Sequence, residues 1–87
     1  MEGFTLEDVE RRNYTFVSVN VINDEGWTKL EEFIVSSPYK LEARALALQY
    51  INNRGWQLRI ISPHSIMLHP RKYIKDARKL FEEGKYL

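Results

Sequence analysis

The chain contains no cysteine, so neither disulfides nor thiolate-bound metal can hold its fold together. A hydrophobic core is then the main source of stability, and 87 residues suffice for one such core. The apolar share of 44% and the charged share of 29% are typical of globular domains. The sequence therefore predicts a single packed domain over residues 1–87.

The N-terminal third has the pattern of a short helix followed by a β-hairpin. Thr5 is suited to cap a helix, because Asp8 follows three residues later, and Asn13 fits its C-terminal end. Residues 14–22 alternate as a strand does, and Asn23–Gly26 has turn composition. Residues 27–35 can return as the second strand, although Leu30–Ile34 is also compatible with a helix.

The remainder of the chain predicts two further helices and two further strands. Ser37 as cap and Pro38 in the first turn open a helix that ends at about Asn53, before Gly55. Strands are predicted over residues 56–62 and 66–69, and a closing helix from Pro70 to about Gly84. The order α-β-β-α-β-β-α predicts an α+β fold with a small, three- to four-stranded, mostly antiparallel sheet. Helices pack on this sheet, whose order is 2-1-3 with strand 4 at the edge.

The central helix carries two apolar stripes. Leu41, Ala45 and Leu48 form one, and a second, broader one covers much of the remaining surface. Such a helix needs cover on two faces, from the sheet and from either the last helix or a second protein molecule. The sequence favours cover within its own chain. If instead a partner packs there, the expected contact residues are Leu46, Tyr50, Arg54 and Trp56.

Charge is divided unevenly along the chain. Residues 1–36 hold eight acids against three bases, a net charge of −5, and residues 37–87 hold ten bases against four acids, a net charge of +6. Either the two halves pair within the fold or one end meets a charged partner. The basic candidates for contact with nucleic acid or an acidic partner lie on one side of the predicted last helix: Arg71, Lys72, Lys75, Arg78 and Lys79.

The inventory of reactive residues favours no catalytic or metal site. His64 and His69 are the only histidines. Their spacing across a turn and a short strand favours opposite faces of the strand, so they are not expected to bind one metal ion together. Ser62 and Ser65 flank His64, but no neighbouring acid completes a triad. We therefore expect no enzyme activity, no cofactor and no metal. The lack of a long apolar run and of a signal-peptide core predicts a cytoplasmic protein without membrane contact.

One segment resembles a known group of proteins. Glu42-Ala43, Ala47, Tyr50 and Gly55-Trp56-Gln57-Leu58, following a hairpin, resemble the strand-helix-strand core of some small phage proteins that bind host RNA polymerase. The likeness covers under half of the chain and carries over no functional residue. We expect a non-catalytic binding module that acts by protein–protein contact, as a homodimer or as a modulator of a larger host machine. The alternative is a nucleic-acid-binding domain that uses the basic C-terminal helix.

Overall fold

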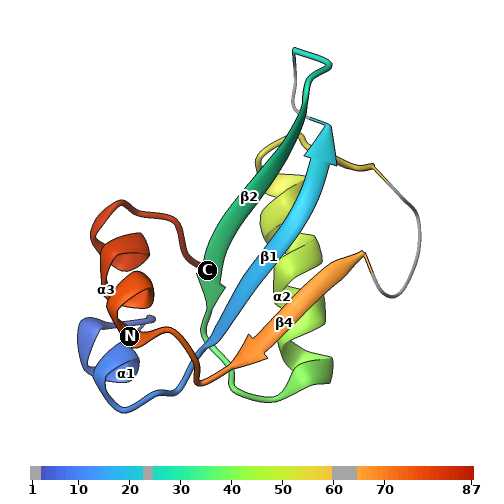
Figure 1. Cartoon of the computed structure of the whole chain (residues 1–87). Helices are drawn as coiled ribbons and strands as arrows, with labels where there is room; N and C mark the ends of the chain where they lie inside the picture. Colours follow the sequence, from blue (N-terminus) through green and yellow to red (C-terminus); the bar gives the residue numbers. More distant parts are fainter. Residues whose placement is uncertain (1–2, 23–24, 60–64) are drawn as a thin grey trace.

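The computed structural model describes residues 3–22, 25–59 and 65–87. Its elements are α1 (Leu6–Glu10), β1 (Thr15–Ile22), β2 (Thr28–Val35), α2 (Lys40–Asn53), β3 (Gln57–Leu58), β4 (Ile66–Pro70) and α3 (Ile74–Glu82). This is the predicted α+β order, and all pairings between the named strands are antiparallel. Figure 1 shows α2 on one face of the sheet, with α1 and α3 packed together at the other.

Helix α1 begins with the predicted capping box. The Thr5 hydroxyl accepts a hydrogen bond from the Asp8 N–H at 3.3 Å, and the Asp8 carboxylate accepts one from the Thr5 N–H at 3.0 Å. The helix ends before the predicted Asn13, because Arg12 already has a left-handed φ of 60°. The Arg12 N–H bonds the Val9 carbonyl at 3.0 Å, and the chain then turns into β1.

Strand β1 is the centre of the sheet. Strand β2 pairs along one whole edge, so the strand interpretation of residues 27–35 is confirmed and the helical one is wrong. On the other edge, β4 pairs with Thr15–Val19 and β3 with Val21 and Ile22. The predicted order 2-1-3 is confirmed. Strand 4, however, does not extend the sheet beyond strand 3, because both pair directly with β1.

Part of the predicted third strand and the turn after it lie outside the described residues. Of residues 56–62, the structure shows a strand at Gln57–Leu58, and residues 60–62 are not described. The predicted turn residues Pro63 and His64 are likewise outside the described part of the chain. In the preceding hairpin, Gly26 has the positive φ, 85°, that its position in a turn predicts.

Helix α2 begins two residues later than predicted. The Ser37 carbonyl accepts a hydrogen bond from the Thr15 hydroxyl at 2.6 Å, and the Ser37 hydroxyl accepts one from the Tyr39 N–H at 3.2 Å. These bonds hold Ser37 against β1 and keep Tyr39 extended, with φ −95° and ψ 128°. The first helical residue is therefore Lys40, and Pro38 belongs to the connection.

The glycines that were predicted to end helices do so, but the start of the last helix was predicted wrongly. Gly55 and Gly84 have φ of 73° and 76°, which other residues adopt at a cost. Pro70 is not in a helix. It pairs with Thr15 at the end of β4, and α3 begins only at Ile74. Proline is tolerated in both places, so the residue type alone did not decide between them.

Two apolar clusters lie on opposite faces of the sheet. The odd-numbered β1 residues face α2, and Val17, Val19 and Val21 are fully buried there. Each such side chain contributes about 1.5–3 kcal/mol relative to an exposed one. The second cluster joins α1, α3 and the start of the sheet: Val9, Tyr14, Phe16, Ile34, Ala77 and Leu80. Each face of the sheet therefore has its own helical cover.

Candidate functional site

Three of the predicted partner-binding residues, Tyr50, Arg54 and Trp56, lie close together near the C-terminal end of α2. The Arg54 guanidinium carbon is 4.8 Å from the centre of the Tyr50 ring and 5.9 Å from that of the Trp56 ring. The Tyr50 and Trp56 rings meet edge to face at 5.9 Å. Leu46 is half-buried against the core of this face. The fold thus brings three of the four predicted residues to one end of α2, whereas Leu46 lies near the middle of the helix.

Tyr50 is part of the core. Its side chain is 4% exposed, and its ring stacks on Phe33 with centres 4.0 Å apart and planes at 14°. Burial raises the pKa of the Tyr50 hydroxyl, and the nearby Arg54 charge opposes this rise. A partner at this end would meet Arg54, which is exposed, and the half-buried edge of Trp56.

The outer face of α2, formed by Leu41, Ala45 and Leu48, is exposed. Leu41 is 87% exposed and Leu48 39%, and Ala45 lies between them on the same side of the helix. The prediction that α2 is covered within its own chain is therefore wrong. The reason is that α3 packs on the opposite face of the sheet, where it covers Phe16 and Ile34.

A shallow hollow continues the outer face at the C-terminal end of α2. This Leu48 hollow has a volume of about 320 Å³. Its walls come from α2, the Gly55 turn and β3, and its lining residues are Leu48, Ile51, Asn52, Trp56, Gln57 and Leu58. One end of the outer face therefore presents a projecting leucine, Leu41, and the other end presents a recess.

The five predicted basic contact residues do not form one helical surface. Because α3 begins at Ile74, Arg71 and Lys72 lie in the link before it, whereas Lys75, Arg78 and Lys79 lie on the helix. All five are exposed. Lys79 borders a separate hollow of about 400 Å³ between α3 and β2. That hollow carries opposed charges from Lys29, Glu31, Glu32, Asp76, Lys79, Glu83 and Lys85.

Arg78 has a partner within the fold. Its guanidinium donates to both carboxylate oxygens of Glu10, at 2.6 and 2.8 Å. The hydrogen bonds from Arg78 lower the pKa of the Glu10 carboxyl below its ordinary value of 4.5. This pair joins α1 to α3, so Arg78 has a structural contact that the sequence did not indicate.

The link before α3 is held against the end of α1. The Arg71 N–H bonds the Tyr14 carbonyl at 3.0 Å, and the Tyr14 hydroxyl donates to the Lys72 carbonyl at 2.8 Å. The Arg12 guanidinium donates to the Arg71 carbonyl at 3.1 Å. Arg12 belongs with these basic residues but was missed from the sequence. Its signal was the Arg11-Arg12 pair directly before β1.

Backbone strain is concentrated in the same place. Arg12, Arg71 and Tyr73 have left-handed φ values of 60°, 62° and 61°, and they are the non-glycine residues with positive φ among those described. Each costs about 1–2 kcal/mol relative to the right-handed conformation. Such conformations persist where surrounding contacts impose them, and they are common at functional sites.

The described residues contain no cluster of three or more His, Asp or Glu side chains that could hold a metal ion. His69 instead packs against Phe16 and Tyr73, with ring centres 6.0 and 5.3 Å away. No described helix is both long and apolar enough to cross a bilayer.

Comparison with known proteins leaves these surfaces to be interpreted on their own. No family model, no curated protein and no solved structure matches the chain.

Proposed function

We propose that the protein is a small binding module that acts by protein–protein contact through the outer face of α2, with a second copy of the chain as the partner. The observation that supports this is Leu41. A leucine that is 87% exposed, in line with Ala45 and Leu48 on a helix, leaves an apolar stripe without cover in its own chain.

The shape of the outer face suits a second copy. Leu41 and Leu48 are separated by about 10 Å along the helix, at 1.5 Å per residue. If two α2 helices pair antiparallel about a two-fold axis near Ala45, each Leu41 lies over the Leu48 hollow of the other copy. A two-fold interface requires this kind of self-complementary surface. The small Ala45 side chain at the axis allows the two helices to approach closely.

The energetics predict a weak dimer. Full burial of two Leu41 side chains contributes about 3–6 kcal/mol, at about 1.5–3 kcal/mol each, and Leu48 adds a smaller amount because it is already partly buried. Loss of translational and rotational freedom costs at least about 4 kcal/mol. The free energy that remains is then at most about 4 kcal/mol, so we expect a dissociation constant of about 1 mM or weaker.

Light scattering and sedimentation at increasing protein concentration test this proposal. We expect the apparent mass to rise from the 10.4 kDa chain mass towards twice that value. Leu41→Glu should remain monomeric, since it places a charge at the centre of the apolar contact. Leu6→Glu is the matched control, because Leu6 is 46% exposed on α1 and should dimerise as the wild type does.

A wild-type protein that stays monomeric at concentrations of several millimolar would overturn the proposal. The same conclusion would follow if Leu41→Glu and Leu6→Glu dimerised equally well. Circular dichroism of both variants establishes that they are folded, so loss of the dimer can be separated from loss of the fold.

A further inference from the structure

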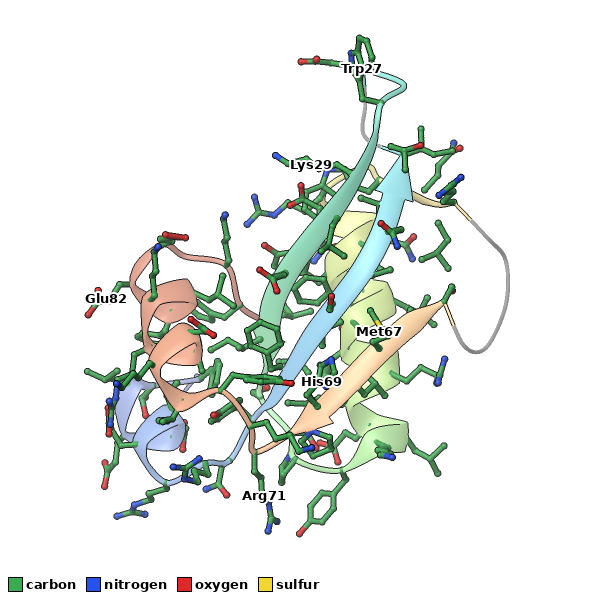
Figure 2. The ribbon with its side chains drawn as sticks, viewed as in Figure 1. Trp27, Lys29, Met67, His69, Arg71 and Glu82 are labelled. Carbon is green, nitrogen blue, oxygen red and sulfur yellow. The ribbon has the colours of Figure 1, made fainter. Side chains whose placement is uncertain are left out.

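The basic end of the molecule, which we define as Arg12, Arg71 and Lys72, lies where α1 meets the link into α3. The three hydrogen bonds that join Arg12 and Tyr14 to this link fix its backbone. Figure 2 shows the Arg71 side chain pointing away from the body of the molecule. These cations are therefore presented from a fixed backbone into solvent.

The ion pairs of the described residues do not include the basic end, although the charge of Arg12 helps Arg78 to lower the pKa of the nearby Glu10 carboxyl. Among residues 3–22, 25–59 and 65–87, no carboxylate forms an ion pair with Arg12, Arg71 or Lys72. The nearby carboxylates of Glu7 and Glu10 are engaged by Arg11 and Arg78. Arg71 and Lys72 thus remain available for an anionic ligand, and Arg12 adds a positive charge that acts in part on Glu10.

An aromatic recess adjoins the basic end. This Tyr73 hollow has a volume of about 150 Å³, and its lining residues are Phe16, Ser18, Glu32, His69, Tyr73 and Asp76. The Tyr73 ring is 51% exposed and lies 5.2 Å from Phe16 and 5.3 Å from His69, between ring centres. Tyr73 directly follows Lys72 in the chain, so the link that carries Arg71 and Lys72 leads into this ring.

The Tyr73 hollow has acidic residues in its lining, whereas the link beside it is basic. Glu32 and Asp76 border the recess, and their carboxylates repel phosphate but accept hydrogen bonds from amino groups. Phosphate is therefore favoured on the side of Arg71 and Lys72, and a ring that carries an amino group is favoured inside. This combination of cations, an exposed aromatic face and base-edge acceptors is the chemistry of nucleic-acid binding.

We propose that this end of the molecule binds single-stranded nucleic acid. Arg12, Arg71 and Lys72 contact consecutive phosphates, and one unpaired base stacks on Tyr73 with its amino group directed to Asp76 or Glu32. A base inside a duplex cannot enter the hollow, because its edge and both faces are occupied. This assignment does not depend on the outer face of α2, so either proposal can fail without the other.

Fluorescence anisotropy with labelled single-stranded 12-mers of DNA and RNA tests the site. With three phosphate contacts and a slope of about −0.7 per contact for single strands, affinity should fall about 20-fold between 50 and 200 mM salt. Arg71→Gln/Lys72→Gln should weaken binding, and it leaves the backbone bonds of the link in place. Lys29→Gln/Arg59→Gln is the matched control, since it removes the same charge at the opposite end of β1.

The stacking contact has its own pair of variants. Tyr73→Asn removes the ring, and asparagine tolerates the left-handed backbone at this position. It should weaken single-strand binding at least about five-fold, which is the lower end for base–aromatic stacking. Tyr39→Asn is the control, because Tyr39 is 66% exposed at the start of α2 and should bind as the wild type does.

Three results would overturn this assignment. The first is the absence of salt-dependent binding at 50 mM salt. The second is an equal loss of affinity in Arg71→Gln/Lys72→Gln and in its matched control. The third is displacement of the oligonucleotide by polyglutamate as effectively as by an unlabelled single strand, which would show a general polyanion surface. Equal affinity for duplex and single strands, with no effect of Tyr73→Asn, would refute the base-stacking contact.

Discussion

Replacing Tyr50 with alanine tests whether the stack of Tyr50 on Phe33 holds α2 on the sheet. The ring is 4% exposed, lies 4.0 Å from Phe33 and also contacts Trp56 and Arg54, so its removal leaves a cavity between helix and sheet. Truncating a buried aromatic residue to alanine costs about 3–5 kcal/mol. A domain of 87 residues has a total stability of about 4–13 kcal/mol. The variant should therefore lose about a quarter of its stability or more.

Urea denaturation followed by far-ultraviolet circular dichroism measures this loss. The midpoint should fall while the slope with denaturant is unchanged, because the surface exposed on unfolding is similar. Tyr39→Ala is the control: Tyr39 is 66% exposed and its side chain makes no cap hydrogen bond to α2, so we expect a change within about 0.5 kcal/mol. If Tyr50→Ala cost less than about 1 kcal/mol, Tyr50 would not be the core residue that we describe.

Two further predictions concern α1 and the end of α2. Because Arg78 lowers the pKa of Glu10, this carboxylate stabilises the fold above its ordinary pKa of 4.5, and the contribution is lost as the pH falls through the lowered pKa. The difference in melting temperature between wild type and Glu10→Gln should thus shrink between about pH 6 and about pH 3, and a constant difference would contradict the pairing. Gly55→Ala should destabilise the protein by about 1–2 kcal/mol in thermal unfolding, because Gly55 has a φ of 73° with open space around it. Gly3→Ala, also in open space but without positive φ, should change little, and equal effects would refute the backbone argument.

The parts of the fold that the sequence predicted well depend on short-range chemistry. The capping box needs only Thr5 and Asp8, three residues apart, and Gly55 ends α2 through its own φ. Strand β1 was predicted from alternation, and its odd-numbered valines face α2 as the pattern requires. In each case residues close together in the sequence carry the information, so no tertiary contact had to be known.

The link into α3 was not predictable in the same way. Arg12, Arg71 and Tyr73 adopt a conformation that their residue types disfavour, and no glycine marks it. It is imposed by hydrogen bonds between segments 58 and 59 residues apart in the chain. The same contacts bring Arg12 beside Arg71, which is why the basic end could not be seen as a unit in the sequence.

The candidate contact surface shows a different limit. The helical wheel of α2 gave two apolar stripes but did not say which one faces the sheet. The structure places Ala43, Ala47, Tyr50 and Ile51 inward, where two alanines allow close approach of helix and sheet. Leu41 and Leu48 are therefore left outside. Whether the outer stripe is covered depends on where α3 packs, and α3 lies on the opposite face of the sheet. That position is a property of the three-dimensional fold and cannot be obtained from the helical wheel.

The ion pairs only partly join the acidic and basic halves of the sequence, and positive charge gathers at one end of the folded surface. The Glu10–Arg78 pair joins the acidic and basic halves, whereas Arg11 with Glu7, Lys29 with Glu31 and Lys85 with Glu83 form within one half. Folding places Arg12, from the acidic half, beside Arg71 and Lys72, which increases the positive charge there instead of cancelling it. Like charges brought together on strained backbone lower stability, so the basic end is costly unless an anion binds. The outer face of α2 carries a corresponding cost in exposed apolar surface. It lies on the opposite face of the sheet from α1 and α3, so the two proposed interactions would not compete.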